Sequence, residues 1–304
     1  AAAHGTRAMR AHADVAPAFG LAGLAGVAEA RDRLAHVLDV QTVAFPQHGV
    51  RRAPGTAELL AEAAGSGLAD LVGGIDPIGF DDDLTGQLDL LFGIADRHGV
   101  GIDLHLHDRG PAGLDVIAAV LDRTRALTLG GKVTISHAFA LVDLPAAELD
   151  RLGSELAAAG IGLTTVAPAG RTLPVRRLRE LGVHVGLGSD GVRDAWSPFG
   201  NADMLHRAHL LASSLRARLD EELELGLRAA AEFGAGLLGL PATDLTPGSP
   251  ADFFLVRGEC PPQVVVDVPP REVVVRAGRV VATDGWLLPD GAAPDPGVGR
   301  GGGH

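Results

Sequence analysis

The sequence predicts an α/β fold, a (β/α)8 barrel of the TIM type with seven of its eight strands in this chain, followed by a small β appendage. Three observations predict it. The chain has 304 residues, 46% of them hydrophobic, which is ample for one large core. Strand-like runs alternate with helix-like runs over residues 1–240. This alternation favours parallel pairing, because each parallel connection needs a crossover, and seven successive units favour a barrel over an open sheet.

The expected strands are short runs that follow one another along the barrel part of the chain. They are Met9–Val15, Val40–Pro46, Leu71–Ile75, Gly101–His107, Lys132–His137, Gly162–Ala167 and Val183–Gly188. The helical patterns between them include Ala57–Ala64, Thr85–Arg97, Gly113–Ala126, Ala146–Ala159 and Val175–Leu181. An eighth strand has no candidate after the seventh, so we expect it to precede Ala1.

Beyond the seventh strand the pattern changes. Two helices are expected at Ala208–Arg218 and Asp220–Phe233, and a break follows at Pro241–Pro250. Short antiparallel strands are then expected at Asp252–Val256, Gln263–Val268, Glu272–Val275 and Arg279–Ala282. We therefore expect residues 1–240 to form the barrel, 241–289 a small β-sandwich-like appendage, and 290–304, rich in Gly, Pro and Asp, a disordered tail.

Composition narrows the classes of partner. A formal net charge of −12 argues against nucleic acid and anionic membranes, which need a concentrated positive surface. The absence of a long uncharged apolar run predicts no membrane span. The single cysteine, Cys260, rules out an internal disulfide and fits a cytoplasmic location. A homo-oligomer is compatible with the sequence.

Polar residues occupy one face of a predicted strand. Asp103, His105 and His107 share one face, while Ile102 and Leu104 share the other with Leu106. Such residues inside a barrel, at the carboxyl ends of strands, indicate a metal or catalytic site, because buried polar groups need partners. Histidines that are satisfied structurally remain the alternative. The triplet Asp81-Asp82-Asp83 is interpreted as a solvated helix start.

Several motifs, in this order and spacing, carry a resemblance. They are Arg10-x-His12-x-Asp14, Val43-Ala44-Phe45-Pro46-Gln47, Asp103-Leu104-His105-Leu106-His107-Asp108, Ser136-His137, the segment from Gly188 to Asn201, and Pro247 to Asp252. The chain resembles the cytosine deaminase-like branch of the amidohydrolase superfamily over nearly its whole length. The resemblance implies a hydrolase that deaminates a nitrogen heterocycle with one divalent metal ion, zinc or iron.

The resemblance also implies roles for individual residues. His105 and Asp190 would be metal ligands, and Asp190 would also accept a proton from the attacking water. His137 would hold and polarise that water, and Asp108 would shuttle protons. For the substrate, Gln47 would form a hydrogen bond and Trp196 would help to wall the pocket. His107, expected behind the ligands, is a further candidate contact.

Three departures from the family pattern qualify this picture. The His-x-His pair of the first strand is absent, and neither His4 nor His12 replaces it. The family's proton-shuttling glutamate is Asp108, which reaches about one methylene less far. The acidic residue that follows the last ligand in cytosine deaminases is Gly191, which makes cytosine itself a doubtful substrate.

Two other functions are compatible with the sequence. Within the same fold, the chain could hydrolyse a ring or side-chain amide, and outside enzymology it could be an inactive binding protein. The only lysine, Lys132, lies far from the position where binuclear family members carry a bridging lysine, so one metal ion is expected rather than two.

Overall fold

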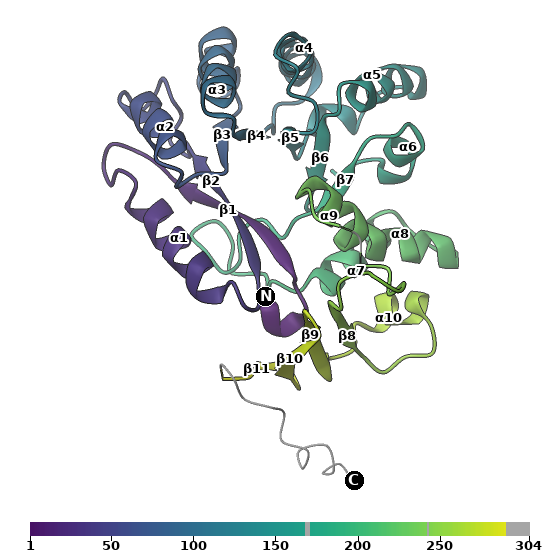
Figure 1. Ribbon diagram of the computed structural model, residues 1–304. Coiled ribbons are helices and arrows are strands. Elements are labelled where there is room, and N and C mark those ends of the chain that lie inside the picture. Colours follow the sequence, from purple (N-terminus) through teal and green to yellow (C-terminus); the bar gives the residue numbers. More distant parts are fainter. Residues whose placement is uncertain (168–170, 242, 290–304) are drawn as a thin grey trace.

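The computed structural model describes residues 1–167, 171–241 and 243–289, and its centre is a curled parallel sheet (Figure 1). Each strand of this sheet lies beside the next strand of the sequence, in the order β1 to β7. The strands are β1 (Ala8–Asp14), β2 (Asp39–Phe45), β3 (Leu71–Ile75), β4 (Gly101–His105), β5 (Val133–Ser136), β6 (Gly162–Thr165) and β7 (Val185–Leu187). The seven-stranded, barrel-type sheet predicted from the sequence is confirmed.

Helices cover the outer face of this sheet, one after each strand as the crossover rule requires (Figure 1). They are α1 (Ala22–Leu34), α2 (Thr56–Gly65), α3 (Leu84–His98), α4 (Gly110–Ala126), α5 (Ala146–Ala158) and α6 (Val175–Glu180), with short 3-10 turns η1 (Ala2–His4) and η2 (Phe139–Leu141). The main hydrophobic core lies between the helices and the sheet, where Leu91 of α3 and Leu104 of β4 are fully buried. The polar residues of the strands, among them Arg10 and Asp103, lie on the inner face of the sheet.

The inner face is closed at one end by a network around Arg10. Its guanidinium group donates to Asp103 Oδ2 at 2.7 Å, Thr134 Oγ1 at 3.0 Å and the carbonyl oxygen of Leu237 at 3.0 Å. It also donates to Gln41 Oε1 at 3.2 Å. Charged and polar groups of β1, β2, β4 and β5 are thus tied together inside the sheet.

A helix from the C-terminal part of the chain completes this closure. Helices α7 (Met204–Ser214), α8 (Asp220–Ala230) and α9 (Glu232–Leu237) follow β7. At the end of α9, the side chain of Leu237 reaches the sheet, where a Cβ atom added at Gly162 or Gly186 would come within 2.3 or 2.8 Å of it. Two neighbouring strands need glycine here so that Leu237 can approach them.

The appendage is a four-stranded antiparallel sheet in the order β11-β10-β9-β8, with one helix. Its elements are β8 (Phe253–Leu255), α10 (Pro261–Asp267), β9 (Val273–Arg276), β10 (Arg279–Thr283) and β11 (Trp286–Leu287). The prediction of a strand at Gln263–Val268 is wrong, because α10 covers all but the last of these residues. Proline at the first helical positions starts α10, and Val268, in the left-handed conformation with φ 45°, ends it.

Ion pairs fasten this appendage to the start of the barrel. Arg7 contacts Asp252 at 2.8 Å, and Arg276 contacts Asp39 at 2.6 Å. Arg271 pairs with Asp203 in a buried contact. The tail predicted for residues 290–304 lies outside the described residues. Among the helices of the described ranges, none combines the length and the apolar character needed to cross a membrane.

Candidate metal centre

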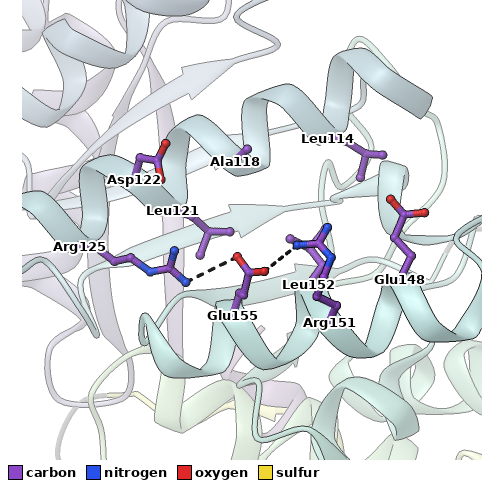
Figure 2. Close-up of a pocket in the computed structure, with 9 residues that line it drawn as sticks. All are labelled: Leu114, Ala118, Leu121, Asp122, Arg125, Glu148, Arg151, Leu152 and Glu155. Carbon is purple, nitrogen blue, oxygen red and sulfur yellow. Dashed lines mark hydrogen bonds and ion pairs between the residues drawn. The ribbon is translucent and has the colours of Figure 1, made fainter.

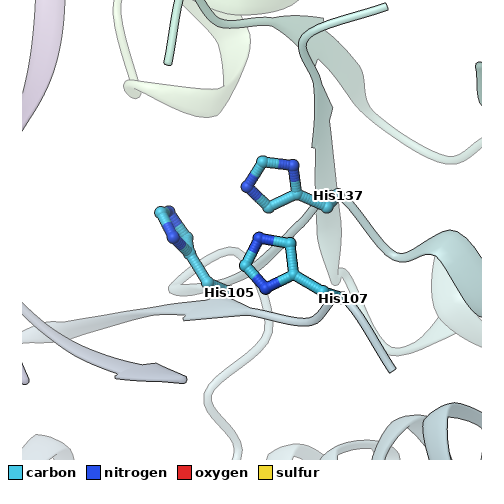
Figure 3. Close-up of side chains that lie close together, drawn as sticks. All are labelled: His105, His107 and His137. Atoms are coloured by element: carbon cyan, nitrogen blue, oxygen red, sulfur yellow. The ribbon is translucent and has the colours of Figure 1, made fainter. Parts of the chain in front are cut away.

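Three histidines converge at the carboxyl end of the parallel sheet (Figure 3). The ring centroids of His105 and His137 are 5.0 Å apart, those of His107 and His137 are 4.4 Å apart, and those of His105 and His107 are 6.0 Å apart. Each ring offers one nitrogen, and these nitrogens all lie within 4.8 Å of one another. The three rings can therefore address a single ion.

The register of the sheet brings His105 and His137 together. In the pairing of β4 with β5, His105 is opposite Ser136, so His137 follows one residue beyond the last pair. His137 has a left-handed backbone with φ 70°, and its N–H group donates to the carbonyl oxygen of Thr164 at 2.9 Å. His137 was expected as the last residue of the strand Lys132–His137, and β5 ends one residue earlier, at Ser136.

His107 lies beyond the end of β4 because a carboxylate captures it. The strand was expected to run to His107 but ends at His105. Asp76, directly after β3, accepts the His107 N–H group at 2.5 Å and the Asp108 N–H group at 3.1 Å. Its other carboxylate oxygen lies 2.7 Å from His107 Nδ1. These contacts replace the strand ladder and turn the His107 ring towards His137.

Asp103 lies two residues before His105 on β4, on the same face of the strand. This carboxylate is fully buried and is held by Arg10 and by the Ser136 hydroxyl, which donates to it at 2.7 Å. His12 Nε2 lies 3.6 Å from Asp103 Oδ1, and the His12 ring centroid is 4.7 Å from that of His105. Burial opposes the ionisation of Asp103, but the interaction with His12 and the positive charge of Arg10 outweigh burial and keep its pKa far below its usual range.

Burial sets the protonation state of the histidines. Burial, reinforced by His12, lowers the pKa of His105 well below its ordinary value. Burial and the nearby His107 lower the pKa of His137 to about 4, against the opposing charge of Asp190. Both rings are therefore neutral near pH 7, and neutral imidazole is the form that ligates metal ions.

The donor set fits a zinc or iron ion. His137 Nδ1 is buried and has no hydrogen-bond partner among the described residues, as expected of a donor that a ligand would satisfy. Imidazole nitrogens suit both metals. His12, Asp103 and His105 form a second group of close donors. The Arg10 guanidinium already neutralises Asp103 there, so the first group is the better cation site.

Asp108 follows His107 in the short loop between β4 and α4. One of its carboxylate oxygens accepts the Gly79 N–H group at 2.8 Å. A Cβ atom at Gly79 would collide with this carboxylate, so only glycine allows so close an approach. Burial raises the pKa of Asp108, with the charge of Asp76 adding to it, despite the hydrogen bond from Gly79.

The remaining predicted site residues lie in the loops that follow β2 and β7. Asp190 is exposed in a left-handed conformation with φ 57°, and it is not in the group of histidine donors. Gln47 is half-buried just beyond β2. Trp196 is 80% exposed, in a turn where the Asp194 carboxylate accepts the backbone N–H group of Trp196 at 2.9 Å. The roles of Asp190, Gln47 and Trp196 stay predictions.

Residues that sequence reasoning missed lie behind the cluster. Asp76 was given no role, although a carboxylate directly after a predicted strand is a signal for one. Asp81, interpreted as solvated, is buried and accepts the N–H groups of Val50, Arg51 and Arg52 at 2.8–3.2 Å, which fixes the loop after Gln47. Asp83 does start a helix, because it caps α3 through the Gly86 N–H group.

A surface cavity elsewhere has a different character. It has a volume of about 120 Å³ and lies between α4 and α5 (Figure 2). Ligand pockets usually measure about 300–1,000 Å³. Both arginines that line it are already paired, since Glu155 contacts Arg125 and Arg151. The histidine cluster therefore remains the stronger candidate site.

Comparisons with known proteins found relatives that match most of this chain. The N-isopropylammelide isopropyl amidohydrolase of Pseudomonas sp. (strain ADP) is 32% identical over 283 residues, which cover 92% of this chain and 70% of that protein. The crystal structure of N-isopropylammelide isopropylaminohydrolase from Burkholderia multivorans has 44% sequence identity and a TM-score of 0.91, covering 94% of this chain and 74% of that one.

A second solved structure is more distant in sequence. It is 5-methylcytosine deaminase from Klebsiella pneumoniae, liganded with phosphonocytosine, with 26% identity and a TM-score of 0.81 over 93% of this chain and 73% of that one. The profile of the amidohydrolase family matches residues 1–282, a span that contains every histidine of the cluster. With its histidines at the carboxyl ends of a barrel-type sheet, this chain belongs to the amidohydrolase family.

Proposed function

We propose that this protein is a metal-dependent hydrolase that cleaves the exocyclic C–N bond of a nitrogen heterocycle. The observation that carries the proposal is the convergence of His105, His107 and His137, whose donor nitrogens lie within 4.8 Å of one another. Burial keeps His105 neutral, which suits it to hold a cation, and keeps His137 neutral, which suits it to accept a hydrogen bond from the attacking water.

The ion we assign to this site is zinc or iron, one per chain. His105 would hold it, with the neighbouring imidazoles within reach, and Asp190 would complete the set from the loop after β7. Such an ion polarises a water molecule and lowers its pKa towards neutrality. The Arg10–Asp103 ion pair supports a single ion, because it places a fixed positive charge beside the second group of donors.

Asp108 is the proton carrier in this proposal. Its raised pKa lets the carboxyl group hold a proton more readily than an exposed aspartate does, and the Gly79 N–H group fixes one oxygen. It can take a proton from the attacking water and pass it to the departing nitrogen. His137 would hydrogen-bond the water and stabilise the charge that develops on the ring.

The substrate proposed is a small heterocycle with an amine substituent. The relatives named above act, by their names, on N-isopropylammelide or 5-methylcytosine, and both compounds carry nitrogen outside the ring. Gln47 and Trp196 would contact the ring from the loops after β2 and β7. Hydrolysis of a cyclic amide remains the second candidate, since the chemistry of the water attack is the same.

A substrate panel separates these candidates. The zinc-loaded and the iron-loaded protein should be incubated with N-isopropylammelide, 5-methylcytosine, a pterin and a cyclic amide, and products identified by mass spectrometry. We expect release of ammonia or an alkylamine with the ring intact. Ring opening would favour the amide reaction instead, and no turnover of any compound by fully loaded protein would contradict the proposal.

Two variants connect turnover to the site. Asp108→Asn keeps the size of the side chain but cannot carry the proton, so we expect a loss of about 10²–10⁴-fold in rate. His98→Ala removes an exposed histidine at the end of α3, at the opposite end of that helix from the cluster, and should leave the rate unchanged. Equal rates for Asp108→Asn and the wild type would remove Asp108 from the mechanism.

A further inference from the structure

We propose that Asp76 is a positioning residue, which fixes the tautomer and the orientation of the His107 ring so that His107 Nε2 completes the imidazole group of the site. This role rests on the proposed metal site. The measurements below can nevertheless fail independently of the proposed reaction.

The carboxylate of Asp76 is directed at residues 107 and 108. One oxygen accepts the backbone N–H groups of His107, at 2.5 Å, and of Asp108, at 3.1 Å. The other oxygen lies 2.7 Å from His107 Nδ1. Asp76 therefore holds both the backbone and the ring of a residue just beyond the end of β4.

The chemistry of the pair decides which nitrogen of His107 carries the proton. An ionised carboxylate can only accept hydrogen bonds, so the Nδ1 atom that faces it must be the donor. A neutral imidazole has one N–H group, and Nε2 is then left with its lone pair. Figure 3 shows the His107 ring turned towards His137, with the ring centroids 4.4 Å apart.

The backbone of Asp76 is held firmly enough to give this carboxylate a fixed position. Its N–H group donates to the carbonyl oxygen of His105 at 3.0 Å, which continues the sheet by one residue. Its own carbonyl oxygen accepts the N–H groups of Phe80 at 2.9 Å and Asp81 at 3.2 Å. The residue adopts φ 30°, a conformation that a residue with a side chain rarely takes unless the surroundings require it.

A helix cap does not account for Asp76. The helix that follows β3 is capped by Asp83, seven residues later, whose carboxylate accepts the Gly86 N–H group at 2.8 Å. Carboxylates that orient metal-bound histidines through their second nitrogen are a general feature of metal sites. The contacts of Asp76 fit that arrangement.

The replacement Asp76→Asn tests this role. Asparagine has nearly the same shape, and its carbonyl oxygen can still accept the backbone N–H groups. Its NH₂ group, however, donates to the His107 ring, which forces Nδ1 to accept and moves the proton to Nε2. Nitrogen-15 NMR of the histidine rings in the metal-free protein measures this tautomer directly, and competition with a chromophoric chelator measures zinc affinity.

We expect His107 to be the Nδ1–H tautomer in the wild type and the Nε2–H tautomer in Asp76→Asn. Zinc affinity should fall by about 10–100-fold in the variant, as is typical when such a partner is removed. The matched control is Asp83→Asn, which makes the same exchange in the segment between β3 and α3. It should change neither the His107 tautomer nor the zinc affinity. Asp76→Glu keeps an accepting carboxylate and should retain the wild-type tautomer.

Several outcomes would overturn the inference. These are an Nε2–H tautomer in the wild type, an unchanged tautomer in Asp76→Asn, or zinc affinity within twofold of the wild type. If Asp76→Asn fails to fold, the wild-type tautomer and the Asp76→Glu variant still decide. A wild-type protein that hydrolyses no heterocycle yet shows the Nδ1–H tautomer would refute the proposed reaction and leave the role of Asp76 standing.

Discussion

Replacing Arg10 with methionine tests whether the ion pair inside the sheet is as important to stability as its burial implies. Arg10 donates to four acceptors, and its main partner Asp103 has only 1% of its side chain exposed. Methionine fills most of the arginine volume, so the loss is mainly electrostatic. Removing one partner of a buried pair leaves an uncompensated charge, and we expect a loss of about 3–5 kcal/mol in the free energy of unfolding.

Urea unfolding followed by circular dichroism measures this loss. The double variant Arg10→Met, Asp103→Asn removes the stranded charge as well, so it should be less destabilised than the sum of the two single variants. The control is Arg177→Met, which breaks an exposed pair with Asp150 and should leave the unfolding midpoint nearly unchanged. If Arg10→Met behaves like Arg177→Met, burial does not decide what this ion pair contributes, and the reasoning is refuted.

The core, the loop after β2 and the histidines each allow a further prediction. Leu104→Ala removes a fully buried side chain between sheet and helices and should cost about 2–5 kcal/mol, measured by thermal or urea unfolding. Burial alone would raise the pKa of Asp81, but its hydrogen bonds, led by those from the backbone of Arg51 and Val50, outweigh burial and lower it. Its contribution to stability is complete above the ordinary carboxyl pKa of about 4 and is lost as pH falls towards the lower folded-state value, so Asp81→Asn should flatten the loss of stability between about pH 5 and pH 3. His105→Ala should bind less than about one tenth of the wild-type zinc in elemental analysis, because His105 belongs to both groups of close donors. Undiminished zinc content would place the metal outside this cluster.

The sequence predicted the sheet well because its signals are local. Strand-like runs separated by helical patterns define parallel units, and the carboxyl ends of such strands share one edge. For this reason the pattern alone placed His105 and His137 together, although they are far apart along the chain. The motif resemblance added the role of each residue, among them proton transfer by Asp108.

What escaped prediction depends on tertiary contacts. Asp76 and His107 follow different strands, and their pairing is decided by where β3 and β4 end, which periodicity locates only approximately. Asp81 was assigned to solvent because acidic runs usually are solvated, but the loop of residues 49–52 folds over it. In the appendage, three consecutive valines suggested a strand, whereas the two prolines before them start a helix.

The contact of Leu237 with Gly162 and Gly186 distinguishes the two ends of the barrel-type sheet. The side chain of Leu237 packs against two strands there, and the carbonyl oxygen of Leu237 accepts a hydrogen bond from Arg10. The loops after β2, β3, β4 and β7 lie at the opposite rim, on the side of the histidines, because the carboxyl ends of parallel strands share one edge. We therefore expect changes of substrate preference to map to those loops. An alanine at Gly186 should displace Leu237 and destabilise this end of the sheet without altering the residues of the site.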